Sequence, residues 1–97
     1  MKLLRKYEIM ILLTDEFNDN ELKSWVSNYT KDLRHFNVLD ISIISRGKHN
    51  LAYSINNKIK GNYVQLNFSS MPKYINNFSN ILRLDSNVLR FFISNKQ

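Results

Sequence analysis

The chain has 97 residues and carries 14 Lys and Arg against 8 Asp and Glu, which gives a formal net charge of +6. This length predicts a single domain over residues 1–97, and the basic balance favours a nucleic acid or an anionic surface as partner. Cysteine is absent, which excludes disulfides, thiolate metal sites and thiol nucleophiles.

The first part of the chain predicts a strand followed by a helix. From Tyr7 to Leu13, every second residue is apolar (Tyr7, Ile9, Ile11 and Leu13), which indicates a strand with one well-buried face. Asn18 is placed to cap a helix, because Glu21 three residues later completes a capping-box pattern. An apolar stripe then predicts a helix of about five turns that covers a sheet and ends near His35; its members are Leu22, Trp25, Val26, Tyr29, Leu33 and Phe36.

The middle of the chain predicts a long hairpin. Strand-forming residues run from Val38 to Ser45 and again from 51 to 55, and Gly47 between them indicates a bulge or bend. Residues 56–61 have turn chemistry, and alternation resumes in a returning strand over 63–68. Basic and aromatic residues are interleaved along this hairpin, which suits RNA, because phosphates attract cations and exposed bases stack on aromatic faces. Taken alone, the pattern is equally compatible with an amphipathic hairpin whose charged face is simply solvated.

A second helix and a last strand complete the predicted order. Pro72 suits the first turn of a helix, with Ser70 as its expected cap, and a polar break at 85–87 precedes a strand over 88–94. Residues from about 94 onward are expected to form a short loose tail. The order β-α-β-β-α-β predicts an α+β, ferredoxin-like sandwich with a four-stranded antiparallel sheet and two helices on one face.

Catalysis is not expected from these residues. The two histidines, His35 and His49, belong to different elements, and no nucleophile, base and orienting group can be recognised around them. No metal, cofactor or small-molecule substrate is therefore expected. An RNA-recognition motif shares the topology, but its third-strand pattern is broken here, because Asn62 occupies an aromatic place and Tyr63 and Phe68 fall on opposite faces.

The N-terminal region lacks the features of a targeting segment. The apolar run Ile9–Leu13 is short for a signal peptide, and no stretch approaches the roughly 18 apolar residues of a membrane span. The 14 dispersed asparagines, together with abundant Ile and Lys, are typical of an AT-rich genome such as that of an organelle. We therefore expect a plastid location, with the bacterial cytoplasm as the alternative.

Four blocks of residues, taken together, resemble the bacterial-type small-subunit ribosomal protein six family. They are the opening Lys6-Tyr7-Glu8-Ile9, the stretch Gly47 to Ile55, the pairs Tyr63-Val64 and Asn67-Phe68 followed by Pro72, and the closing Arg83 to Arg90. Three positions depart from the family pattern: Arg46 stands in place of a frequent tryptophan, His49 weakens a cationic stretch, and Ser54 replaces a proline.

The resemblance implies a structural constituent of the small ribosomal subunit. Such a protein would bind the central domain of the small-subunit rRNA together with small-subunit ribosomal protein eighteen. Carried onto this chain, and joined with the basic hairpin, it gives the candidate RNA- or partner-binding residues Lys6, Tyr7, Arg46, Lys48, His49, Tyr53, Lys58, Lys60 and Arg90. For Tyr7 and Tyr53, a structural role at a sheet edge is the equal alternative. Met10 and Leu12 are expected on the face opposite the helices, where they would meet the partner protein. The alternative function is a free-standing ferredoxin-like sensor or protein-interaction domain.

Overall fold

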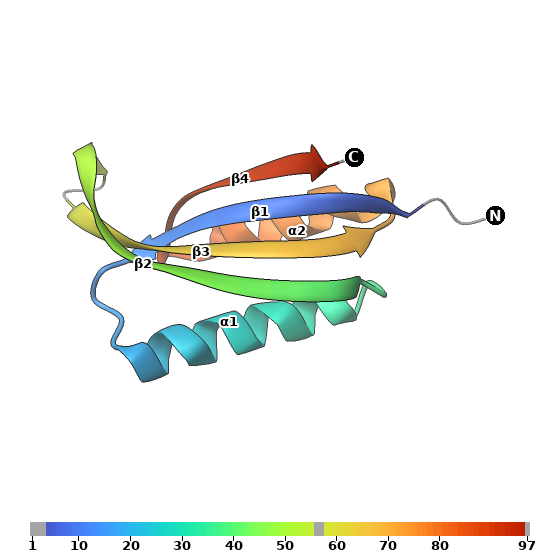
Figure 1. The fold of residues 1–97 in the computed structure, drawn as a ribbon, viewed down its shortest axis with the longest axis horizontal. Coiled ribbons are helices and arrows are strands. Elements are labelled where there is room, and N and C mark those ends of the chain that lie inside the picture. The colour runs from blue at the N-terminus through green and yellow to red at the C-terminus, as the bar shows by residue number, and fades with distance from the viewer. Residues whose placement is uncertain (1–3, 56–57, 97) are drawn as a thin grey trace.

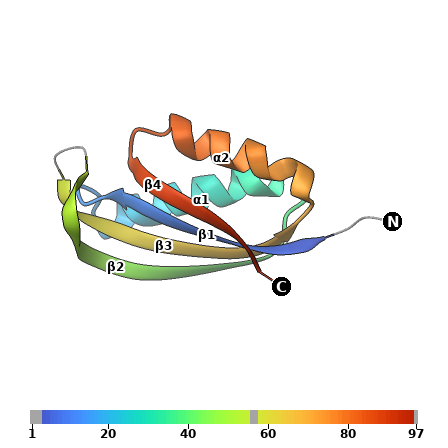
Figure 2. The same cartoon turned by 90° about the horizontal axis from the view of Figure 1, so that it is seen from above.

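The computed structural model describes residues 4–55 and 58–96. Within them the elements are β1 (Arg5–Thr14), α1 (Asp19–Arg34), β2 (Leu39–Ile55), β3 (Lys58–Ser70), the 3₁₀ turn η1 (Pro72–Tyr74), α2 (Ile75–Leu84) and β4 (Val88–Lys96). The strands form an antiparallel sheet in the order β2-β3-β1-β4 (Figure 1). Both helices cover the same face of the sheet (Figure 2), which confirms the ferredoxin-like expectation. Neither described helix is long and apolar enough to cross a membrane.

Strand β1 lies at the centre of the core. It pairs with β3 on one side and with β4 on the other, and its apolar alternation aligns with that of both neighbours. Ile9, for example, pairs with Leu66 and Ile93, and both Ile9 and Leu66 are fully buried. The helices close this face with side chains that are themselves buried, including Leu33 of α1 and Phe78 of α2.

Helix α1 begins and ends as its sequence predicts. The Asn18 side chain accepts a hydrogen bond from the Glu21 amide at 2.8 Å, and the Glu21 carboxylate accepts one from the Asn18 amide at 3.0 Å. His35 forms the C-cap, and Asn37 follows with φ of 59°, a left-handed conformation that asparagine tolerates. The Trp25 indole donates to the Asp85 carboxylate at 2.6 Å, which ties α1 to the turn after α2.

The hairpin of β2 and β3 is longer and more continuous than the sequence indicates. Its second strand begins at Lys58, so residues 58–61 belong to a strand rather than to the predicted turn, while residues 56–57 lie outside the described part. Polar strands that extend past the core carry no apolar alternation, and the pattern therefore gave no signal there. The register shifts between Ser45 and Gly47, and Gly47 has φ of +79°, which confirms the expected irregularity.

Two other boundaries differ from expectation. Ser70 is the last residue of β3 and does not cap a helix; Met71 precedes η1 instead, without a side-chain hydrogen bond, and Pro72 is the first residue of the turn. Strand β4 continues to Lys96, beyond the expected end at Ser94 and into the predicted tail. Pairing with β1 explains the extension, because Asn95 lies opposite Tyr7 and Lys96 opposite Lys6.

Removal of the capping box should destabilise the domain. The variant Asn18→Ala leaves the Glu21 amide without its side-chain acceptor, and we expect the free energy of unfolding to fall by about 1 kcal/mol in urea titrations. The matched control is Asn28→Ala, an exposed position within the same helix, where alanine should be neutral or slightly stabilising. Equal effects of the two substitutions would contradict a specific capping contribution.

Tyr29 should make the fold sensitive to alkali. Burial, with a smaller contribution from the charge of Asp32, raises the pKa of the Tyr29 hydroxyl above its ordinary value of 10.0. The folded chain therefore keeps a proton that the unfolded chain releases, so this stabilisation is complete below about pH 10 and is lost as the pH rises further. Above pH 10, the free energy of unfolding should decline more steeply for the wild type than for Tyr29→Phe, by up to about 1.4 kcal/mol per pH unit. Parallel declines in alkaline urea titrations would refute this assignment.

Candidate nucleic-acid interface

The sheet has an open face, which we define as the face opposite the two helices. The register places Met10 of β1 between Gln65 of β3 and Phe92 of β4 on this face. One step further along, Leu12 lies between Tyr63 and Arg90. Because paired residues of antiparallel strands point to the same side, all these neighbours lie on the same side of the sheet.

Arg90 organises the part of the open face that adjoins the β2–β3 hairpin. Its Nη1 atom donates to the Tyr53 hydroxyl at 2.7 Å, which connects β4 to β2 across the sheet. Its guanidinium carbon lies 5.6 Å from the centre of the Tyr53 ring and 5.7 Å from that of Phe92, within the range of cation–π attraction. Hydrogen bonds to Tyr63 and Tyr53 raise the pKa of Arg90. Neutral hydroxyl partners orient the guanidinium without cancelling its charge.

A second polar network crosses the open face at Gln65. The Arg46 guanidinium donates to the Gln65 side-chain oxygen, with distances of 2.5 Å from Nη2 and 3.2 Å from Nε. The Gln65 amide nitrogen donates in turn to the Glu8 carboxylate at 2.7 Å. Beside this network lies a hollow of about 420 Å³, lined by Met10, Arg46, His49, Asn50 and Tyr63. The network holds Arg46 at the rim of a concave surface.

The other predicted cations do not share one surface. Lys48 pairs with Asn62, which also pairs with the core residue Leu13, so Lys48 lies on the helix side of the hairpin. Lys60 pairs with Asn50 on that same side, whereas His49 pairs with Gly61 and contacts the Tyr63 ring on the open side. Lys6 lies opposite Ser69, near the other end of β3. The hairpin therefore presents positive charge on both of its faces, and Lys6 stands apart from it.

Two residues predicted as contacts are buried instead. Tyr7 is 7% exposed and packs its ring against Phe68 on the helix side of the sheet, with 5.9 Å between ring centres. Leu12 is 1% exposed, so the expectation that it is an exposed partner residue is wrong. It does point to the open face, but its side chain fills the space beside Gly61, where an added Cβ would overlap one of its methyl groups. Met10 is partly buried, and the Lys58 side chain lies outside the described part.

Phe92, Tyr63 and Gln65 belong to this surface although the sequence does not single them out as contact residues. Phe92 is 60% exposed, and Tyr53 beside Arg90 is 62% exposed. Alternation within the last strand separates Phe92 from Phe91, which pairs with Ile11 on the core side. That alternation was available in the sequence, but the face of each aromatic depended on the pairing register with β1.

Comparison with known proteins identifies the family of the chain. The sequence model described as ribosomal protein S6 matches residues 6–95. The chain belongs to this family. It is 75% identical over 97 residues to the small ribosomal subunit protein bS6c of Phaeodactylum tricornutum, covering 100% of this chain and 99% of the relative. It is 62% identical to bS6c of Trieres chinensis over 96 residues, which covers 99% and 100% of the two chains.

A solved structure supports the fold independently of these relatives. The crystal structure of 30S ribosomal protein S6 from Thermotoga maritima superposes with a TM-score of 0.89 at 19% identity, covering 97% of this chain and 89% of that one. Membership in a structural family of the ribosome confirms that the chain is not an enzyme. The plastid-type relatives named bS6c confirm the expected plastid ribosome. The family also favours a ribosomal component over a free-standing sensor.

The link between Arg90 and Tyr53 should control local order in the hairpin. The variant Tyr53→Phe keeps the ring but removes the acceptor of the Arg90 hydrogen bond, so amide hydrogen exchange in 50–55 should accelerate several-fold. Global stability should change little, because the pair is solvent-exposed. Tyr74→Phe serves as the control outside the open face. Unchanged exchange in the hairpin of Tyr53→Phe would show that the link does not hold this segment.

Proposed function

We propose that this S6-family chain binds the central domain of the small-subunit rRNA through its β2–β3 hairpin and the adjoining open face, together with small-subunit ribosomal protein eighteen. The observation that carries the proposal is the arrangement of Arg90 against Tyr53 beside the hairpin cations. Affinity would come from phosphate contacts, and exposed rings would contact bases or riboses.

The hairpin supplies the electrostatic part of the proposed contact. Lys48 and Lys60 are exposed on its helix side, and His49 and Arg46 are exposed on the open side. Cations on two faces of a projecting hairpin can meet phosphates from two backbone segments of a folded RNA. Such contacts release counterions and make binding salt-dependent.

The apolar part of the open face supplies the proposed protein contact. Phe92 is well exposed and lies opposite the partly buried Met10, so the two form an apolar patch at the β1–β4 side of the sheet. Aromatic residues and methionine are enriched at protein interfaces, and here they are neighbours on one face. Protein eighteen would cover this patch and leave the hairpin to the RNA.

Charge reversal on the hairpin tests the RNA contact. The double variant Lys48→Glu/Lys60→Glu should bind a central-domain rRNA fragment, with protein eighteen present, at least tenfold more weakly than the wild type in filter-binding assays at about 0.15 M salt. If each lysine neutralises one phosphate, the slope of log K against log salt concentration should decrease in magnitude by about 2. The stability of the domain should not change, because both side chains are exposed.

The matched control makes the same total change in charge at two lysines outside the hairpin. Lys31→Glu/Lys73→Glu alters two exposed lysines near the helices and should retain most of the affinity and the full salt slope. Equal losses in the two double variants would mean that net charge, rather than the hairpin, governs binding. A separate Phe92→Ala variant should weaken the association with protein eighteen in pull-down titrations while leaving the RNA salt slope unchanged.

A further inference from the structure

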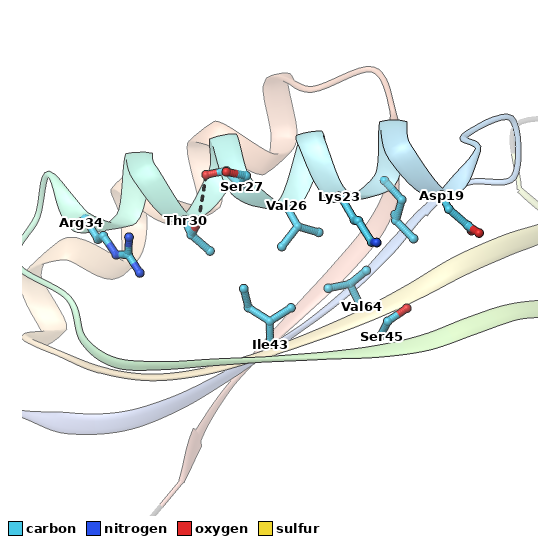
Figure 3. A pocket seen from close by; sticks show the side chains of 10 residues that line it. Asp19, Lys23, Val26, Ser27, Thr30, Arg34, Ile43, Ser45 and Val64 are labelled. Carbon is cyan, nitrogen blue, oxygen red and sulfur yellow. Dashed lines mark hydrogen bonds between the residues drawn. The ribbon is translucent and has the colours of Figure 1, made fainter.

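A groove runs between α1 and β2, on the helix side of the sheet and away from the open face. It measures about 520 Å³, and its lining includes the apolar side chains Leu22, Val26, Ile43 and Val64. Figure 3 shows the α1 side chains above Ile43, with open space between the helix and the strand. Ile43 is 48% exposed although its pairing partner Leu66 is fully buried. The helix therefore leaves the core-side face of β2 incompletely covered.

The strand beside this groove is also an edge of the sheet. Strand β2 is outermost in the order β2-β3-β1-β4, so one side of its backbone has no neighbouring strand in the described sheet. Residues 42–45 pair with β3 in regular register between two irregularities. Lysine, proline and bulges commonly protect edge strands against strand addition. The segment 41–45 has neither lysine nor proline, and its stretch 42–45 lies between the irregularities rather than on one. A strand of about four residues could therefore add here by backbone hydrogen bonds.

The rim of the groove selects the charge of its occupant. Lys23 and Arg34 of α1 line the groove, and Asp19 lies at the end of the groove where α1 begins (Figure 3). Lys23 and Arg34 are eleven positions apart, which corresponds to about 16 Å along a helix. Two acidic side chains four positions apart on a strand are separated by about 13 Å, within reach of both cations. An apolar side chain midway between them would face Ile43.

We propose that this groove binds a short extended peptide segment of a partner protein, which adds to the edge of β2 as a further strand. The segment has the groove-facing pattern acidic, apolar, acidic at alternate positions. A second copy of this chain fits less well, because each copy carries a net charge of +6 and would bring further cations toward Lys23 and Arg34. The irregularities at both ends of 42–45 also limit pairing to a short segment.

A peptide titration with the full chain tests this site. The probe is a fluorescein-labelled nine-residue peptide with glutamate at positions three and seven, valine at position five, and serine or threonine elsewhere, followed by fluorescence anisotropy. Saturable binding is expected. N-methylation of alternate backbone nitrogens in the peptide should abolish it, because strand addition requires backbone N–H donors. Ile43→Lys should weaken binding at least tenfold, whereas Leu84→Lys, an exposed apolar position on α2, should not.

Charge exchange provides the second readout. Lys23→Glu should weaken binding of the glutamate peptide and strengthen binding of a peptide with lysine at the same two positions, and circular dichroism would confirm that both variants remain folded. The proposal would be overturned if the N-methylated peptide bound as tightly as the unmodified one, or if Ile43→Lys and Leu84→Lys weakened binding equally. Absence of saturable binding would overturn it as well. Dimerisation of the wild type in sedimentation experiments that Ile43→Lys abolishes would assign the groove to a second copy and would also overturn it.

Discussion

The pairing of β1 with two neighbouring strands is the constraint on which the rest of the structure depends. Each side chain of β1 must point either to the helices or to the open face. Because paired residues point to the same side, the register then determines the side to which each partner residue of β3 and β4 points. A shift by one residue would move Ile9 and Ile11 into solvent and Glu8 into the core. Burial of the apolar set on one side therefore fixes which side chains are displayed on the other. The set of side chains displayed on the open face is therefore specified by the core beneath it.

The open face is preorganised by contacts between its own side chains. Tyr53 and Arg90 join β2 to β4, although β3 and β1 lie between these strands, and Gln65 joins Arg46 to Glu8. These links fix long side chains before any partner arrives, which lowers the entropy lost on binding. Leu12 contributes from below, since it fills the space that Gly61 leaves and supports the surface without being part of it. A rigid display of cations and rings follows from ordinary packing.

The sequence predicts the fold better than the surface, for a physical reason. Apolar period, the Asn18 capping pair and Pro72 are local signals, and they place the strands and helices in the right order. The hairpin between 45 and 61 gives a weaker signal, because strands that extend past the core need no alternation. The face of an aromatic side chain depends on pairing across the sheet, which explains why the sequence left Tyr7 open between a contact and a structural role and did not single out Phe92. Lys48 and His49 are adjacent in sequence, but strand geometry sends them to opposite sides.

The proposed interfaces occupy different parts of the molecule, and this separation follows from the position of α1. The helix packs against the core-side face of the sheet and leaves both the hairpin and the outer edge of β2 uncovered (Figure 2). RNA on the hairpin, a protein on the Met10–Phe92 patch and a peptide at the β2 edge would each contact different side chains. A chain of 97 residues can in this way contact several components of one particle, because each sheet face and the free edge has its own chemistry. The shared framework of β1 and β3 would hold those contacts at fixed separations.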